Sequence, residues 1–263
     1  MNGSGVIVRR PDDAPHVAEL ILDRPGAMNA VSTAQAAAIA AAAAELAADR
    51  SVRAVVLSSS AEKAFCVGAD LKERNAATDD DLRRQRPTAR SAYRGILDLP
   101  VPAIAAVHGY ALGGGCELAL ACDLIVADET AVFGLPEVSV GVVPGGGGTQ
   151  LLARRVGWGR AADLIFTARR LDAEEAYRLG IADRLVPAGA ARKAALDLAA
   201  TVARHSPVGV RNAKRAMRLG LDAALPAGLE IEDAAWRATA FSGDRKEGVA
   251  AFNEKRDPDW PGE

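Results

Sequence analysis

Runs of apolar residues alternate with alanine-rich or polar segments along the first part of the chain. Residues 17–22 (VAELIL) and 52–58 (VRAVVLS) are predicted to be buried strands, because both are short and rich in aliphatic side chains. The segment between them, residues 32–48, is dominated by alanine, and Ser32 suits the position that caps a helix N-terminus. The order strand, helix, strand predicts an α/β fold with crossover connections.

The same alternation continues further along the chain. Strands are predicted at residues 100–107, 124–127, 131–133 and 181–186, and helices at residues 116–121, 149–156, 163–168 and 172–180. Residues 109–115 are expected to turn the chain sharply between a strand and a helix. From residue 190 to residue 254 helical spacing prevails, interrupted at Pro207 and Pro226. We therefore expect an α/β core over residues 1–198 and a helical region over residues 199–263.

The most polar segment, residues 73–91, carries three consecutive aspartates from Asp79 and then four arginines. This composition is typical of a solvated helix and loop. It also fits a mobile lid whose arginines contact an anionic ligand.

Candidate chemistry gathers in residues 105–149, which hold two glycine runs and two glutamates. Gly113, Gly114 and Gly115 stand between a predicted strand and a predicted helix, where free backbone N–H groups and the helix dipole favour negative charge. Glu117 and Glu137 stand in mostly apolar sequence, which is costly for an unpaired carboxylate and marks both as acid–base candidates. Each also fits a structural role, Glu117 beside the helix dipole and Glu137 with a surface partner.

Composition narrows the classes of function. The chain has 263 residues, 49% of them hydrophobic, and 32 Lys and Arg against 34 Asp and Glu. This balance argues against a protein that coats nucleic acid or an anionic membrane. No lysine follows the four glycines from Gly145, so a phosphate-binding P-loop is not expected.

The three cysteines form no CxxC pair and stand near no histidine cluster, so we expect reduced, buried thiols and no metal site. No stretch of 18 uninterrupted apolar residues occurs, and the first residues lack the apolar run of a signal peptide. We therefore expect a soluble, cytoplasmic protein that binds neither membrane nor nucleic acid.

Four motifs occur in order along the chain: AFCVGADLKE (64–73), AAVHGYALGGGCELALACD (105–123), FGLPEVSVGVVPGGGGTQ (133–150) and GVAAFNEKRDP (248–258). With them the chain resembles the crotonase, or enoyl-CoA hydratase/isomerase, superfamily over about residues 17–256. The resemblance implies a spiral of strand–strand–helix (ββα) units, with a helical C-terminal region that forms trimers, which often pair into hexamers. It also implies an acyl-CoA thioester substrate with no separate cofactor.

The resemblance assigns roles to four residues. In this family two backbone N–H groups form an oxyanion hole around the thioester carbonyl, and the matching residues here are Ala69 and Gly114. Hydratases of the family hold one water between two carboxylates, which match Glu117 and Glu137. General acid–base catalysis at the double bond needs such a pair within hydrogen-bond reach.

The resemblance also places coenzyme A. Its contacts are expected at Arg24, Ala27, Ala69, Asp70, Leu71, Lys72, Gly114 and Lys255, with the cations near phosphates and Lys255 contributed in some cases by a neighbouring subunit. The alternative for Arg24, Lys72 and Lys255 is that they are ordinary surface residues in contact with solvent.

Both glutamates together favour an enoyl-CoA hydratase, because isomerases of the family commonly lack the first carboxylate. The alternatives are an isomerase or related acyl-CoA enzyme that uses chiefly Glu137, and a non-catalytic member that binds acyl-CoA or RNA.

Overall fold

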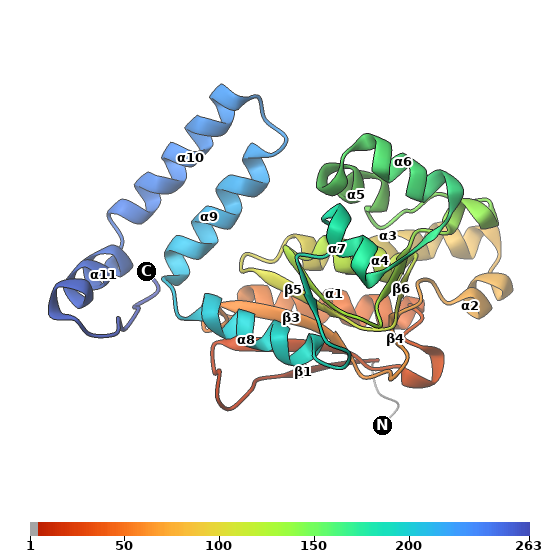
Figure 1. Cartoon of the computed structure of the whole chain (residues 1–263), viewed down its shortest axis with the longest axis horizontal. Coiled ribbons are helices and arrows are strands. Elements are labelled where there is room, and N and C mark those ends of the chain that lie inside the picture. The colour runs from red at the N-terminus through yellow and green to blue at the C-terminus, as the bar shows by residue number, and fades with distance from the viewer. Residues whose placement is uncertain (1–4) are drawn as a thin grey trace.

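The computed structural model describes residues 5–263, whose strands form two sheets (Figure 1). The larger sheet has the order β1-β2-β3-β5-β7-β10 and is parallel except for β1, which runs antiparallel to β2. Its strands are Val6–Arg9, Val17–Leu22, Ala54–Ser59, Ala103–Val107, Leu124–Asp128 and Arg184–Val186. The smaller sheet has the order β4-β6-β8-β9, with β9 antiparallel to β8. Its strands are Ala64–Cys66, Tyr110–Leu112, Val132–Gly134 and Arg170–Asp172.

The chain passes repeatedly from a strand of the larger sheet to a strand of the smaller sheet and then to a helix. The units are β3-β4 followed by α2 (Leu71–Ala76) and α3 (Asp79–Leu97), β5-β6 followed by α4 (Gly114–Ala121), and β7-β8 followed by α5 (Gly148–Val156). The expected ββα order is thus confirmed. The remaining core helices are α1 (Thr33–Ala48), α6 (Trp158–Thr167), α7 (Ala173–Leu179) and α8 (Ala191–Ala203).

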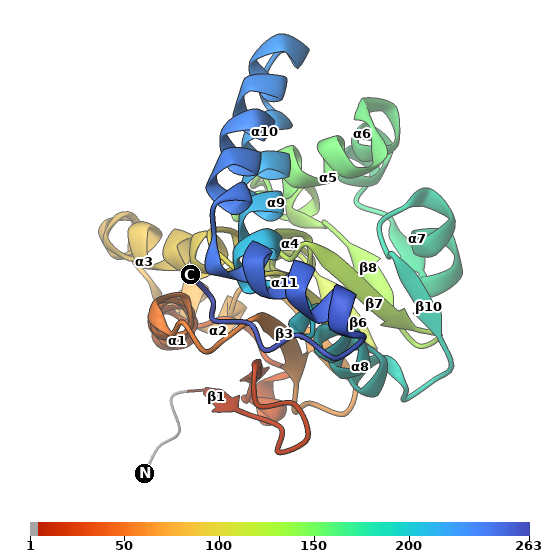
Figure 2. The ribbon, with the colours of Figure 1, turned by 90° about the vertical axis from the view of Figure 1, so that its left-hand side faces the viewer.

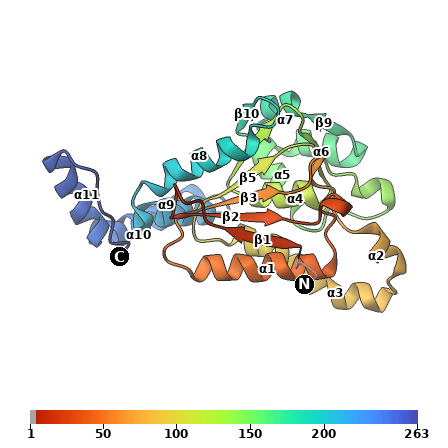
Figure 3. The ribbon, with the colours of Figure 1, turned by 90° about the horizontal axis from the view of Figure 1, so that it is seen from below.

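The apolar strand runs are explained by burial on both faces of the larger sheet. On β3, Val55 and Leu57 belong to the main core, whereas Ala54 and Val56 belong to a second cluster on the other face. Because successive side chains of a strand point to opposite faces, a sheet covered on both sides requires a continuous apolar run. Helices α1 and α8 lie on opposite sides of the sheet (Figure 3).

The C-terminal helices α9 (Pro207–Gly220), α10 (Leu225–Ala240) and α11 (Gly243–Glu254) extend away from the two sheets (Figures 1 and 2). Asp123 fixes α9 to the core, since its carboxylate accepts hydrogen bonds from Lys214 at 2.7 Å and Arg218 at 2.9 Å. Pro207 and Pro226 stand in the first turns of α9 and α10, where a missing backbone N–H costs little.

The expected division after residue 198 falls inside α8. Ala195, Leu198 and Ala199 of this helix are buried in the second cluster, against the larger sheet. Residues of α8 before and after the expected boundary are therefore packed in the same part of the core. The two-region organisation and the oligomerising role of the second region stay predictions.

Several short elements differ from the sequence-based expectation. Residues 109–115 do not form one sharp turn, because Tyr110–Leu112 is strand β6. The strand predicted at residues 100–107 begins only at Ala103. The polar segment 73–91, by contrast, matches the expected solvated helix and loop, because α2 ends at Ala76 and α3 begins at Asp79 after a short break. Thr78 and Asp81 form a capping box at the start of α3.

Two further expectations concern the cysteines and the membrane. Cys66, Cys116 and Cys122 are free and buried, as expected. Within residues 5–263, no helix combines the length and the apolar character needed to cross a membrane.

Candidate active site

The loop after β4 and the first turn of α4 approach each other backbone to backbone. Gly115 packs so closely on β4 that an added Cβ would overlap the carbonyl oxygen of Cys66. Gly68 has a φ of +89°, and a Cβ there would lie 2.8 Å from the oxygen of Leu112 and 3.1 Å from the nitrogen of Gly114. Only glycine combines this backbone conformation with this proximity.

The close approach brings together two backbone N–H groups that have no acceptor in the described chain. Around Ala69, Val31 N–H donates to Gly68 O at 2.7 Å and Asp70 N–H donates to Val31 O at 3.0 Å, which holds the loop but leaves the Ala69 N–H unused. Gly114 is the first residue of α4, where a backbone N–H has no partner within its own helix. Two free donors therefore flank the same gap, beside the positive end of a helix dipole.

Glu117 is buried in the first turn of α4 and is held by the second glycine run. Its Oε1 accepts hydrogen bonds from the backbone N–H groups of Gly146 at 2.7 Å and Gly148 at 2.8 Å. Burial raises the pKa of this carboxyl, and the hydrogen bonds oppose that rise only in part. Oε2 has no hydrogen-bond partner among residues 5–263, so it stays free for a ligand.

Glu137 begins the short 3₁₀ helix η2 (Glu137–Val140) and points back toward the start of α4. A Cβ on Gly113 would lie 3.1 Å from its Oε1, and its Oε2 is buried with no hydrogen-bond partner in the described structure. Burial, together with the negative charge of Glu117, raises the pKa of Glu137 to about 7. The alternative, structural role of Glu137 requires a surface partner for its carboxylate, and no such partner is found within residues 5–263. A buried carboxylate oxygen without a partner is expected to bind a water or a ligand.

Tyr93 of α3 is a further site residue that the sequence analysis missed. A Cβ on Gly114 would collide with its Oη, and a Cβ on Gly146 would lie 2.7 Å from its ring. The side chain therefore packs between Gly114 and the loop that holds Glu117. No sequence motif includes this position. A single aromatic residue in a polar helix is usually a packing residue, so no signal in the sequence pointed to a role in the site.

The residues expected at coenzyme A fall into two groups. Most of them lie on one rim, formed by Ala27, Leu71 and Lys72. Ala27 belongs to the 3₁₀ helix η1 (Pro25–Ala27), and the residue after this helix accepts a hydrogen bond from Val67 N–H. Leu71 and Lys72 are exposed at the start of α2. Lys255 follows α11, at the opposite end of the molecule from α2 (Figures 1 and 3). One protomer therefore does not bring Lys255 to the rim.

Arg24 and Asp70 support this rim from within the chain. Arg24 hydrogen bonds with Ala30 O and with the Asp70 carboxylate, the latter at 3.0 Å. Asp70 also caps α2, accepting from the N–H groups of Lys72 and Glu73. Burial opposes the ionisation of Asp70, but these hydrogen bonds outweigh it and hold its pKa below the usual value. Both residues thus fix the loop that carries Ala69.

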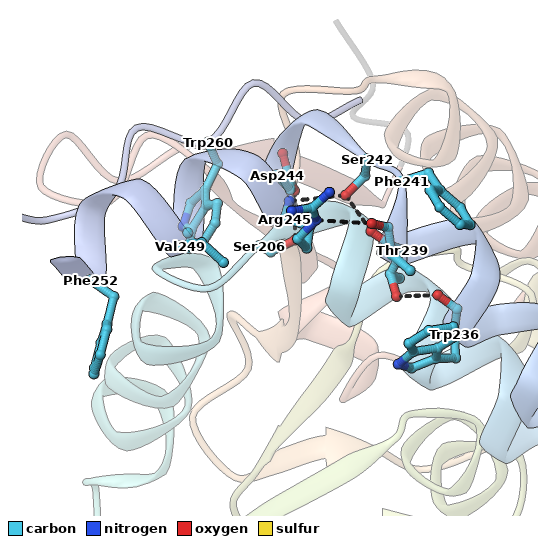
Figure 4. Close-up of a pocket in the computed structure, with 12 residues that line it drawn as sticks. Ser206, Trp236, Thr239, Phe241, Ser242, Asp244, Arg245, Val249, Phe252 and Trp260 are labelled. Carbon is cyan, nitrogen blue, oxygen red and sulfur yellow. Dashed lines mark hydrogen bonds between the residues drawn. The ribbon is translucent and has the colours of Figure 1, made fainter.

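A groove of about 790 Å³ lies elsewhere, along α10 and α11 (Figure 4). Its walls are mostly apolar, and four of the twelve residues that line it are aromatic: Trp236, Phe241, Phe252 and Trp260. Its carboxylate, Asp244, already accepts hydrogen bonds from Ser206 Oγ and two backbone N–H groups. The groove therefore lacks free acid–base groups. Among residues 5–263, no cluster of His, Cys, Asp and Glu is arranged to hold a metal ion.

The raised pKa of Glu137 gives a pH-dependent effect on stability. Because its folded pKa of about 7 exceeds the ordinary glutamate value of 4.5, Glu137 contributes stability that is present at low pH and is lost as the pH rises through 7. Replacing Glu137 by glutamine should therefore raise the melting temperature more at about pH 8 than at about pH 5. Thermal unfolding of both proteins at the two pH values checks this, and an equal difference at both would contradict the raised pKa.

Comparison with known proteins identifies the family. The family model for enoyl-CoA hydratase/isomerase matches residues 13–263. A putative enoyl-CoA hydratase/isomerase, YngF, of Bacillus subtilis is 42% identical over 241 residues, which cover 92% of this chain and 93% of that protein. The mouse mitochondrial methylglutaconyl-CoA hydratase is 44% identical over 219 residues, covering 82% of this chain and 70% of the relative.

A solved structure gives the same result. The crystal structure of an enoyl-CoA hydratase from Bacillus anthracis superimposes with a TM-score of 0.95 at 39% identity, covering 98% of this chain and 100% of that one. The chain therefore belongs to the enoyl-CoA hydratase/isomerase family, and its fold is the crotonase fold.

Proposed function

We propose that the protein is an enoyl-CoA hydratase, which adds water reversibly across the 2,3 double bond of an acyl-CoA thioester. The observation that carries this proposal is the pairing of Glu117 with Glu137, each of which keeps one carboxylate oxygen without a partner in the described chain. Glu117 is close enough to raise the pKa of Glu137, and two neighbouring carboxyls with unpartnered oxygens suit a water that must be held and deprotonated. The free N–H groups of Ala69 and Gly114 beside them suit the thioester.

The backbone donors act on the thioester oxygen. Attack on the β carbon of a conjugated thioester moves negative charge onto this oxygen. Donors that are already fixed in position stabilise that charge without reorganising. Removing one such donor typically costs roughly 3 kcal/mol of transition-state stabilisation. In the proposed reaction Ala69 and Gly114 fill this role, and Gly114 adds the dipole of α4.

The two carboxyls divide the proton transfers. Glu117 is the base: it takes a proton from the water, whose oxygen bonds to the β carbon. Glu137 is the acid: its raised pKa keeps a proton available near neutral pH, and that proton is transferred to the α carbon. Proton exchange with solvent restores both groups. Because the ionisation of one carboxyl affects the ionisation of the other, the two apparent pKa values describe the pair and not either residue alone.

The coenzyme A portion of the substrate lies, in this proposal, along the rim that holds Ala27, Leu71 and Lys72. The Arg24 and Asp70 side chains shape this rim, and Lys255 of a neighbouring protomer reaches the nucleotide end. The thioester is the substrate itself, and the proposed reaction uses no further cofactor.

Isomerisation of a 3-enoyl thioester is the second candidate, since it needs chiefly Glu137. The fixed position of Glu117 favours hydration, because moving a proton between two carbons needs only one carboxylate and would not use Glu117. A substrate panel of 2-enoyl and 3-enoyl thioesters separates the two. It should include methylglutaconyl-CoA and 2,3-dehydroadipyl-CoA, the compounds for which a mouse and an Escherichia coli relative are named.

We also propose that the protein assembles as a homotrimer, or a pair of trimers, through its C-terminal helices. The aromatic side chains of Trp236, Phe241 and Phe252 are exposed by 64%, 77% and 83% in the single chain. Large side chains gathered in one groove and left this exposed are typical of a surface that another chain covers. A second and third copy of this chain would supply that cover, and would bring Lys255 toward a neighbour's rim.

The acid–base pair is tested by conservative substitution. Glu117→Gln and Glu137→Gln should each lower the kcat for hydration of crotonyl-CoA by at least about 100-fold, because each removes one proton-transfer group. Binding of crotonyl-CoA should be retained. The exposed Glu62→Gln serves as the matched control and should keep full activity. A protein that binds crotonyl-CoA but hydrates it equally well with both glutamates replaced would refute the mechanism.

The assembly is tested by light scattering after size-exclusion chromatography. The mass in solution should be a multiple of three times the 27.3 kDa of one chain. Changing Trp236 and Phe252 together to serine should shift the population toward the monomer, because the apolar contact is removed. A monomeric wild-type protein at micromolar concentration would contradict the assembly.

A further inference from the structure

We propose that Tyr93 is a substrate-contacting residue of this site, whose hydroxyl donates a third hydrogen bond to the thioester oxygen as negative charge develops on it. The proposal rests on the hydratase function proposed above and adds a side-chain donor to its two backbone donors. The Oη atom of Tyr93 has no hydrogen-bond partner among residues 5–263 and can therefore donate to a bound substrate.

The hydroxyl lies where the two halves of the oxyanion site meet. An added Cβ on Gly114 would collide with Tyr93 Oη, and the same point lies 3.5 Å from the Cα of Gly68. Gly68 directly precedes Ala69, so Oη, the Gly114 residue and the loop that carries Ala69 converge on one small volume. A thioester oxygen bound by both backbone N–H groups would occupy this neighbourhood.

The ring is fixed from the other side. It packs on Gly146, where an added Cβ would lie 2.7 Å from three ring atoms, and the N–H of Gly146 in turn binds Glu117. Neighbouring residues Ala92 and Ile96 of α3 are fully buried in the core, which anchors this part of the helix. The hydroxyl is therefore held in place before substrate binds, as a donor in an oxyanion site must be.

The charges around Tyr93 determine what its hydroxyl can do. Burial, followed by the negative charge of Glu117, raises the pKa of Tyr93, whereas Arg74 opposes this rise. Cys66 and Glu137 also face it and act in the same direction as Glu117. The hydroxyl thus keeps its proton, which makes it a hydrogen-bond donor and excludes a role as a base.

A packing role for the ring is the competing explanation, since Tyr93 also contacts the main core. The two explanations differ in what the oxygen atom contributes. Tyr93→Phe removes only that atom and keeps the ring against Gly146. The exposed Tyr177→Phe, on α7, is the matched control for loss of a tyrosine hydroxyl.

The test compares steady-state hydration of crotonyl-CoA by the wild type and both variants. Tyr93→Phe should lower kcat by about 100-fold with little change in KM, because the lost hydrogen bond acts mainly in the transition state. Tyr177→Phe should match the wild type. A kcat of Tyr93→Phe within about twofold of the wild type, whatever its KM, would overturn the proposal.

A spectroscopic readout separates hydrogen bonding from a general loss of structure. A cinnamoyl-CoA thioester absorbs at longer wavelength when donors polarise its carbonyl. Its absorption maximum should therefore shift less on binding to Tyr93→Phe than to the wild type. An equal shift in both would also overturn the proposal. If the wild type itself neither binds nor hydrates enoyl thioesters, the proposed function fails. If the wild type is active and Tyr93→Phe equals it, only the role of Tyr93 fails.

Discussion

The close packing of the loop after β4 against the first turn of α4 is the contact on which the site depends. Strands β4 and β6 are parallel neighbours, so the segments that follow them leave the same edge of the smaller sheet. At that edge Gly68 and Gly115 allow the two backbones to touch, which no side chain at either position would permit. Residues from two separate ββα units thereby present the free N–H groups of Ala69 and Gly114 to one gap.

The second constraint is electrostatic. The site holds one buried and one half-buried carboxyl. Burial opposes the ionisation of both, and the negative charge of Glu117 adds to the cost for Glu137. Two backbone N–H groups from the second glycine run reduce this cost for Glu117, whereas the buried Oε2 of Glu137 receives no such support. This unequal support is the physical reason for the proposed assignment of Glu117 as base and Glu137 as acid. Arrangements that leave polar groups unpaired lower stability, and they are retained where function needs them.

Much of this organisation could be predicted from the sequence, because it depends on local patterns. Strand β2 has the predicted limits, Val17–Leu22, and Ser32 caps α1 by accepting a hydrogen bond from Gln35 N–H. The glycine runs and both glutamates stood out because glycines beside carboxylates in apolar sequence are unusual. The family resemblance supplied the roles, which the residues alone left open between catalysis and a structural function.

Other features depend on tertiary contacts that the sequence does not display. Strands β4, β6 and β9 have three residues each, too few to show a period, and they exist because neighbouring strands pair with them. Tyr93 looks like any aromatic residue of a helix until the packing on Gly114 and Gly146 is known. The distance between Lys255 and the rim depends on how α11 extends from the core, which the sequence does not show.

The central claim is that Ala69 and Gly114 together hold the thioester oxygen, and a crystal structure with a bound, unreactive acyl-CoA tests it most directly. The account predicts the carbonyl oxygen at about 2.7–3.1 Å from both backbone nitrogens, with the β carbon facing Glu117 and Glu137. An acyl-CoA whose carbonyl contacts neither nitrogen, or that binds only in the groove beside Trp236, would contradict it.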